Sequence, residues 1–168
     1  LVVDWLETIK NPCAWLSLDS DDNDMPRFLR YLIAVLQKLD KKIGMTVQTA
    51  LESSKIPPMK MIMTSLINDI SCLNKEYVLV IDNYHEITNL EINTAFQFLI
   101  QSHIPHLHII LISREVPSLP LAQLRAKRLL TDITVSDLRF RVNEVKAFLN
   151  QVSHLQFSDS QIKLLTER

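Results

Sequence analysis

Tyr77-Val-Leu-Val-Ile-Asp82 is an almost unbroken run of β-branched and aliphatic residues that ends in a carboxylate. Such a run is typical of a parallel strand that helices bury on both faces. A helix is predicted from about Glu91 to Ser102, and His108-Ile-Ile-Leu-Ile-Ser-Arg114 is a second run of the same kind. A strand, a helix and a strand form one crossover unit with parallel strands. This stretch therefore predicts an α/β protein.

The flanking sequence extends the alternation in both directions. Upstream, Cys13-Ala-Trp-Leu-Ser-Leu18 is a short apolar run ended by acidic turn residues, so we expect a strand there. Downstream, Asp132-Ile-Thr-Val135 is a further candidate parallel strand. We therefore expect a three-layer, doubly wound parallel sheet. Apolar spacing and prolines predict helices over Leu1 to Ile9, Pro26 to Leu39, Met61 to Leu73, Asn143 to Val152 and Ser158 to Arg168, with a short one after Pro120 that ends at Leu129.

Two regions are expected from this order of elements. Residues 1–140 hold the predicted strands and form the α/β core. Residues 141–168 form the start of a helical lid, and Ser158-Asp-Ser-Gln161 opens its second helix in capping-box spacing.

The composition excludes several classes of protein. A net charge of -1 and a pI of about 6.6 leave no basic surplus for binding nucleic acid. Gly44 is the only glycine, where an average chain of this length has roughly a dozen, so these residues contain no glycine-rich phosphate loop. Cys13 and Cys72 lie in apolar patterns and are expected to be small buried thiols. Because we find neither a signal peptide nor an apolar run of ~20 residues, we expect a cytoplasmic location.

Polar residues end the two strongest predicted strands. Ligands of open parallel sheets gather at the carboxyl ends of strands, where Asp82 and Ser113-Arg114 stand. Asp82 is a candidate for organising magnesium and water, or alternatively an acid that caps the next turn. Arg114 is a candidate for contacting a triphosphate, or alternatively the partner of a surface ion pair with Glu115.

Two other clusters are set aside. Asp19, Asp21, Asn23 and Asp24 resemble a calcium loop, but Asp24 replaces the turn glycine and Arg30 replaces the bidentate glutamate, so a solvated loop is expected. The histidines His103, His106 and His108 are separated by Pro105 and a strand start, and no further ligand completes a metal shell.

Several blocks of the sequence resemble the MalT-like, LuxR-type large transcriptional regulators, which belong to the STAND class of P-loop NTPases. The blocks occur in the family's order and cover nearly the whole chain. They are Ala14 to Asp19, Asp21 to Asp24, Arg27 to Ala34, Val80 to His85, Ser113 to Glu115 with Pro117 and Pro120 to Ala122, and Asp137 to Phe140.

The resemblance assigns roles to residues at the strand ends. Asp82 matches the Walker B acid that helps to hold magnesium, Arg114 matches the sensor arginine beside Ser113, and His85 occupies a recurring histidine position. By the same resemblance the chain starts just after the Walker A loop. Asn83 stands where the family usually has a second acid; it can orient water but cannot accept a proton, which argues against efficient hydrolysis. Arg141 stands where the family places a hydroxyl helix cap.

The function that the resemblance implies is an ATP-dependent switch in a bacterial transcriptional activator. ATP or ADP with magnesium binds at the strand ends, with weak ATPase activity at most. A small-molecule inducer and DNA bind through other domains, activation promotes self-association, and no membrane is involved. Two alternatives stay open. One is a degenerate interaction domain that binds no nucleotide. The other is a receiver-like domain with Asp82 as phosphoacceptor and Ser113 as switch hydroxyl, although Thr131 to Ser136 lacks the lysine which such a site needs.

Overall fold

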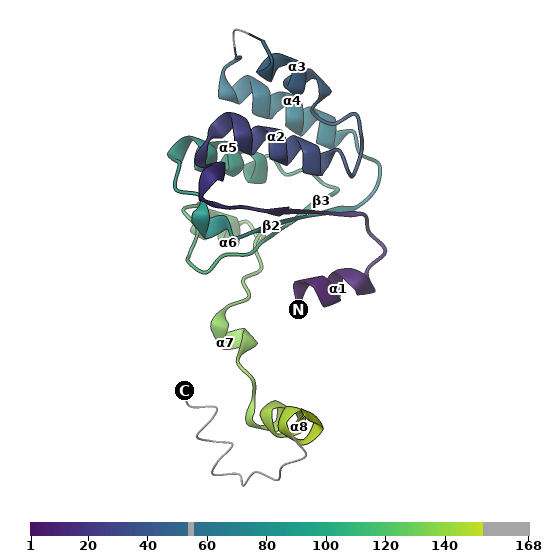
Figure 1. The fold of residues 1–168 in the computed structure, drawn as a ribbon, viewed down its shortest axis with the longest axis vertical. Helices are drawn as coiled ribbons and strands as arrows, with labels where there is room; N and C mark the ends of the chain where they lie inside the picture. Colours follow the sequence, from purple (N-terminus) through teal and green to yellow (C-terminus); the bar gives the residue numbers. More distant parts are fainter. Residues whose placement is uncertain (54–55, 153–168) are drawn as a thin grey trace. The chain divides into compact units, whose positions relative to one another are not determined.

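The computed structural model describes residues 1–53 and 56–152 (Figure 1). Its contacts divide the chain into two compact units, Leu1–Pro120 and Leu121–Arg168, which we describe one at a time. The division predicted after residue 140, between an α/β core and a helical lid, stays a prediction. Among the described residues, no helix combines the length and the apolarity that crossing a membrane requires.

The first unit is built on a parallel sheet of three strands, β1 (Cys13–Ser17), β2 (Tyr77–Asp82) and β3 (Leu107–Leu111). β2 lies between β1 and β3, and the register places Leu79 opposite both Ala14 and Ile109. Each strand was predicted from its apolar run. An α/β protein with a parallel sheet is therefore confirmed.

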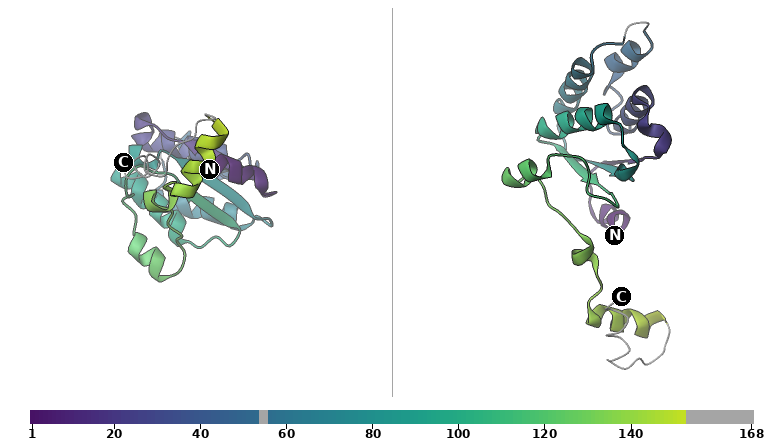
Figure 2. Two further views of the ribbon diagram at one scale, coloured as in Figure 1. Left: turned by 90° about the horizontal axis from the view of Figure 1, so that it is seen from below. Right: turned by 90° about the vertical axis from the view of Figure 1, so that its left-hand side faces the viewer.

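The helices between the strands cover one face of this sheet. Figure 1 and the right-hand view of Figure 2 both place helices α2 to α5 on the same side. The strand order is β1-β2-β3, so both crossovers move in the same direction across the sheet. Crossovers of the same hand that move in one direction place their helices on the same face. A doubly wound sheet needs a strand order that reverses direction, so that helices cover both faces. The doubly wound, three-layer arrangement therefore stays a prediction. The helices are α2 (Met25–Leu36), α3 (Met45–Leu51), α4 (Met59–Ser71) and α5 (Leu90–Gln101), while α1 (Val2–Thr8) precedes β1.

The main core lies between the sheet and these helices. Leu79 and Ile81 of β2 are fully buried there, against residues such as Phe28, Ile33 and Phe96 of the helices. Burying one aliphatic side chain of this size stabilises the fold by about 1.5–3 kcal/mol. Val78 and Val80 point to the opposite face by strand alternation and are buried as well. Burial of β2 on both faces explains its unbroken apolar sequence.

Helix α3 was missed by the sequence analysis, and the single glycine begins it. Gly44 is its N-cap with φ +71°, a conformation that favours glycine. A Cβ atom at this position would lie 2.7 Å from Cγ2 of Ile33, so space also demands glycine. The Gly44 N–H donates to Oδ2 of Asp69 at 2.9 Å, which ties this turn to α4.

Cys13 and Cys72 correct one expectation. Both thiols are free and exposed, not buried. Cys13 begins β1, and Cys72 is the C-cap of α4. Each lies at the end of its element, where an apolar pattern no longer guarantees burial.

The second unit contains α6 (Leu121–Ala126), α7 (Val135–Leu138) and α8 (Val142–Val152). The strand predicted over Asp132 to Val135 is wrong, because α7 begins at Val135. Thr134 and Asp137 form a capping box, and the hydrogen bonds from Thr134 lower the pKa of the Asp137 carboxyl. The helix cap therefore prevails over the β-branched composition.

The start of α8 resembles half of a capping box. Oε2 of Glu144 accepts the N–H of Arg141 at 2.7 Å, so the cap forms without the hydroxyl that the resemblance led us to expect. The helix itself was predicted over nearly the same residues. The helix predicted from Ser158 to Arg168 lies outside the described residues.

Candidate functional site

The predicted site residues gather at the carboxyl edge of the sheet. Beyond the last register pair, the N–H of Ile112 donates to the carbonyl of Ile81 at 2.8 Å. The N–H of Tyr84 then donates to the carbonyl of Ile112 at 3.0 Å. These bonds hold the turn after β2 against the residue that precedes Ser113 and Arg114. We call Asp82, Asn83, His85, Ser113 and Arg114 the strand-end cluster.

Asp82 ends β2 with a half-buried carboxylate. Its Oδ1 accepts the N–H of Asn83 at 2.9 Å, which is the turn-capping role that the sequence left open. Asn83 has φ 58°, and asparagine is among the few residues that adopt this left-handed conformation readily. Within residues 1–53 and 56–152, no cation pairs with Asp82. One of its oxygens is thus committed to the turn and the other is available to a ligand.

Ser113 and Arg114 follow β3 and behave differently from each other. The Ser113 hydroxyl donates to the carbonyl of Glu115 at 2.6 Å and accepts the N–H of Glu115 at 3.3 Å, so it shapes the turn. Arg114 is exposed, and in the described part of the chain it forms neither the ion pair with Glu115 nor another one. Its guanidinium is therefore available to an anion.

His85 lies in the short helix η2 (Tyr84–Glu86) directly after Asn83. Its Nε2 is 3.4 Å from Oε1 of Glu86. Its Nδ1 is buried and has no hydrogen-bond partner in the described structure. Leaving a buried polar atom unpaired costs about 1–3 kcal/mol, so Nδ1 of His85 is a polar atom at this edge whose hydrogen-bonding capacity the described residues do not use.

The acidic residues after β1 form a contrasting region, residues 19–24, which we call the acidic loop. Asp22 is almost completely buried, and its Oδ1 accepts the Arg27 Nε–H at 3.0 Å. Oδ2 of Asp22 accepts the N–H of Asp19 at 3.0 Å, and Oδ1 of Asp24 accepts the N–H of Arg27 at 3.0 Å. These carboxylates cap helices and pair with Arg27.

A network of asparagines, which the sequence did not reveal, ties the two regions together. Oδ1 of Asn23 accepts the N–H of Asn89 at 2.9 Å, and the Asn23 amide donates to the carbonyl of Glu86 at 2.7 Å. The Asn93 amide donates to the carbonyl of Asn89 at 3.0 Å, and its Oδ1 accepts the buried Tyr84 hydroxyl at 2.8 Å. Burial raises the pKa of Tyr84 well above its ordinary value. In the sequence Asn93 is one of several polar residues of α5, so the pattern alone does not reveal this network.

The described residues form no cluster of three or more histidine, cysteine, aspartate or glutamate side chains that could hold a metal ion. Two of the three histidines set aside above have a carboxylate partner. His106 and His108 approach Glu76 instead, with His108 Nε2 at 2.6 Å from Oε2. The bond to His108, followed by that to His106, lowers the pKa of Glu76. Asp82 alone cannot enclose a cation.

Comparison with known proteins gives a consistent but distant relationship. No protein-family model matches the chain. The HTH-type transcriptional regulator MalT of Vibrio parahaemolyticus is 30% identical over 151 residues, which is 90% of this chain. The chain is similar to MalT. It is also 28% identical over 169 aligned positions, 99% of its length, to the serine/threonine-protein kinase PknK of Mycobacterium tuberculosis and of Mycobacterium bovis.

The chain spans only part of these relatives. It covers 17% of MalT and 15% of PknK, so it corresponds to about one sixth of each. A transcriptional regulator and a protein kinase have different functions, yet both match nearly the whole of this chain. The shared segment therefore does not by itself carry either complete function.

Proposed function

We propose that this chain is part of the nucleotide-binding switch domain of a MalT-type transcriptional regulator. In this proposal ATP or ADP binds with magnesium at the strand-end cluster. An inducer and DNA bind through domains outside the chain, and activation promotes self-association. Hydrolysis is slow, because Asn83 cannot accept a proton from the attacking water.

One observation supports this proposal above the others: a carboxylate at the end of β2 and a guanidinium three residues after the end of β3 have no ion-pair partners in the described residues. Asp82 ends β2, and Arg114 closely follows β3. A carboxylate and a guanidinium that follow adjacent parallel strands and lack ion-pair partners in the described residues are suited to a ligand which carries both a cation and an anion. A magnesium nucleotide has this character.

The cluster fits magnesium only together with the nucleotide. Magnesium keeps several waters and is usually bound by one or two carboxylates plus substrate phosphates, so a single acid such as Asp82 is sufficient. His85 and Asn83 would orient water, while Ser113 and Arg114 would contact phosphate oxygens. When bound, the cation would supply charge that offsets the phosphates.

The phosphate-binding loop is the part of the proposal that rests mainly on the resemblance. In the resembling family a Walker A loop and its strand precede a helix like α1. The outer edge of β3 has no strand partner among the described residues, and Ile109, Ile110 and Leu111 are only partly buried. Room for a further strand beside β3 supports this arrangement.

The test is a titration of the full-length protein with magnesium and ATP, read as heat or as a thermal shift. We expect Asp82→Ala and Arg114→Ala each to weaken binding by about tenfold or more, since each removes a charged contact worth roughly 1.5–3 kcal/mol. Arg30→Ala, which removes an exposed arginine of α2, is the matched control and should leave binding unchanged. Equal affinity in all variants would reject the proposal.

A second candidate, a domain that keeps the fold and binds no nucleotide, is favoured by one observation. Asn83 occupies a left-handed turn position, for which asparagine has a purely conformational reason. For this candidate, ATP with magnesium produces no thermal shift in the full-length wild-type protein.

A further inference from the structure

Asn23, in the acidic loop, holds a segment that lies 63 to 66 residues later in the chain. Its amide donates to the carbonyl of Glu86 at 2.7 Å, and its Oδ1 accepts the N–H groups of Thr88 at 2.7 Å and of Asn89 at 2.9 Å. Its own carbonyl accepts the Asn89 amide at 2.9 Å. One half-buried residue thus joins the loop after β1 to the segment between β2 and α5.

A chain of three hydrogen bonds leads from Asn23 to the carboxylate of Asp82. It starts with the bond from the Asn23 amide to the Glu86 carbonyl. The N–H of Glu86 donates to the carbonyl of Asn83 at 3.0 Å, and the N–H of Asn83 donates to Oδ1 of Asp82 at 2.9 Å. Each bond constrains the backbone that carries the next one, because hydrogen bonds weaken steeply when donor and acceptor are misaligned. The position of Asn23 therefore bears on the orientation of the Asp82 carboxylate.

The short helix η2, through which this chain runs, depends on contacts with other segments. It has three residues, and Asn83 at its N-cap forms no side-chain cap. The N–H of Tyr84 fixes its start to the carbonyl of Ile112, and the Asn23 amide fixes its end at Glu86. A single 3₁₀ turn has poor hydrogen-bond geometry of its own. Loss of Asn23 would therefore release the end of η2.

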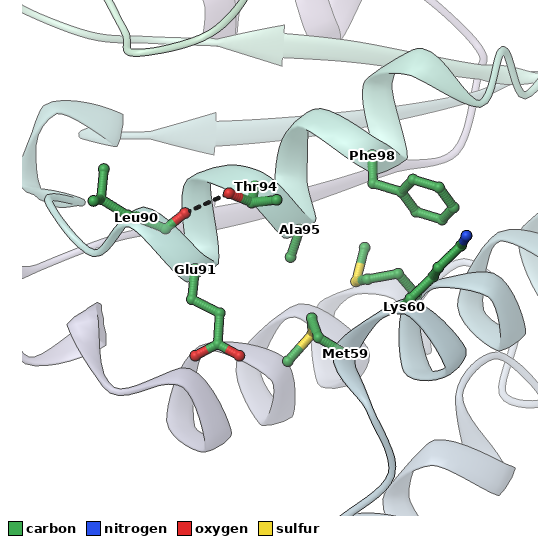
Figure 3. A pocket seen from close by; sticks show the side chains of 8 residues that line it. Met59, Lys60, Leu90, Glu91, Thr94, Ala95 and Phe98 are labelled. Carbon is green, nitrogen blue, oxygen red and sulfur yellow. Dashed lines mark hydrogen bonds between the residues drawn. The ribbon is translucent and has the colours of Figure 1, made fainter.

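Helix α5, by contrast, holds its own first turn. Oδ1 of Asn89 accepts the N–H of Glu91 at 2.8 Å. The Thr94 hydroxyl donates to the carbonyl of Leu90 at 2.7 Å, which Figure 3 shows as a dashed line. The helix also buries Phe96 in the core. Loss of Asn23 would therefore disturb η2 more than α5.

We propose that Asn23 is a positioning residue of the strand-end cluster, which acts on Asp82 through η2. The inference deepens the proposed function and rests on it for nucleotide binding. Asp82 is the only carboxylate of the cluster, and magnesium demands near-ideal octahedral geometry from its ligands. A carboxylate that is held in one orientation meets this demand better than one that turns freely. Asn23 thereby contributes to binding the magnesium nucleotide without touching it.

Amide hydrogen exchange of the full-length protein without nucleotide tests the positioning by itself. Asn23→Ala should accelerate exchange at residues 83–86 by about fivefold, since it removes the bond that holds the end of η2. Exchange within α5, at residues 93–101, should change by less than about twofold. Asp24→Ala is the matched control. Its Oδ1 accepts the N–H of Arg27, so this variant removes a bond within the same loop and α2 without reaching η2.

A second substitution at the same position separates the two branches of the network. Asn23→Asp keeps an oxygen that accepts the N–H groups of Thr88 and Asn89, but it has no amide to donate to Glu86. It should therefore accelerate exchange at residues 83–86 as Asn23→Ala does, and leave exchange at residues 88 and 89 as in the wild type. Because the tether to α5 remains, this variant keeps the test informative if Asn23→Ala folds poorly.

Nucleotide titration of the full-length protein tests whether Asn23 acts through Asp82. We expect Asn23→Ala to weaken binding of ATP with magnesium by about fivefold and Asp24→Ala to leave it unchanged. In the Asp82→Ala background, Asn23→Ala should change the affinity by less than about twofold, because the carboxylate that it positions is gone. A role in overall stability alone would give the same loss in both backgrounds.

Two results would overturn the inference. One is unchanged exchange at residues 83–86 in both Asn23 variants, and the other is an equal loss of affinity from Asn23→Ala with and without Asp82. The inference and the proposed function fail separately. If exchange follows the expected pattern while the wild-type protein does not bind ATP, Asn23 still positions Asp82 and the proposed function falls.

Discussion

The acidic loop and the strand-end cluster lie at the same edge of one sheet, yet they differ in how their charges are satisfied. In the acidic loop, Asp22 is buried and bonded to both Arg27 and a backbone N–H. In the strand-end cluster, Asp82 accepts one local N–H, and Arg114 has no ion-pair partner among the described residues. The difference separates carboxylates that stabilise the fold from a carboxylate that is available to a ligand.

The largest effect on stability is expected in the acidic loop. Asp22→Ala removes a buried carboxylate and leaves Arg27 without its shortest ion pair. Breaking such a pair costs several kcal/mol when both groups are buried; Arg27 is one-third exposed, so we expect about 2–3 kcal/mol. Urea unfolding measures this loss. If Asp22→Ala changed the free energy of unfolding by less than about 0.5 kcal/mol, the carboxylates of the acidic loop would not be the ones that stabilise the fold, and the contrast between the two regions would not hold.

A smaller effect is expected at Tyr84, which anchors the turn of the strand-end cluster. Tyr84→Phe removes the hydrogen bond to Asn93 and should cost about 1 kcal/mol. The substitution also changes the pH dependence. Burial raises the pKa of Tyr84 above its ordinary value of 10.0, so the folded state holds this proton more tightly than the unfolded state.

The sign of the pH effect follows from that shift. Tyr84 contributes its full stability below about pH 10, and this contribution is lost as the pH rises further, because only the unfolded state ionises readily there. Unfolding measured from pH 8 to pH 11 should therefore show a steeper alkaline decline in the wild type than in Tyr84→Phe. Parallel stability curves for the wild type and Tyr84→Phe would contradict this prediction. They would indicate that the Tyr84 hydroxyl is hydrated in the folded state.

The smallest effect on stability is expected at Asp82. Its side chain makes one short-range bond, so Asp82→Ala should change the free energy of unfolding by less than about 1 kcal/mol. Urea unfolding under the same conditions as for Asp22→Ala makes the comparison direct. A loss as large as that of Asp22→Ala would assign Asp82 a role in holding the fold.

Much of the sheet could be predicted, because strands buried between layers need long apolar runs, and Tyr77 to Asp82 is such a run. The strand predicted from Asp132 to Val135 failed because Thr134 and Asp137 cap a helix at that point. The spacing of Thr134 and Asp137 in the sequence is that of a capping box, and this cap decides the segment against its β-branched residues.

The candidate site was predictable only where it depends on strand ends. Parallel strands bring Asp82 and the start of the segment after β3 to one edge, whereas the position of Arg114 also depends on the loop in which it lies. The asparagine network was not predictable, because its bonds join Asn23 to residues 65 and 66 positions away. Some polar atoms, such as Nδ1 of His85, lack a hydrogen-bond partner among the described residues. Which atoms these are also depends on residues that are distant in the sequence.

The most direct test of the contrast between the two regions is amide hydrogen exchange of the full-length protein, with and without magnesium and ATP. The account predicts slower exchange on nucleotide addition at residues 82–85 and 112–115, and unchanged exchange in the acidic loop at residues 19–24. Protection confined to the acidic loop, or no protection at either strand end, would contradict it.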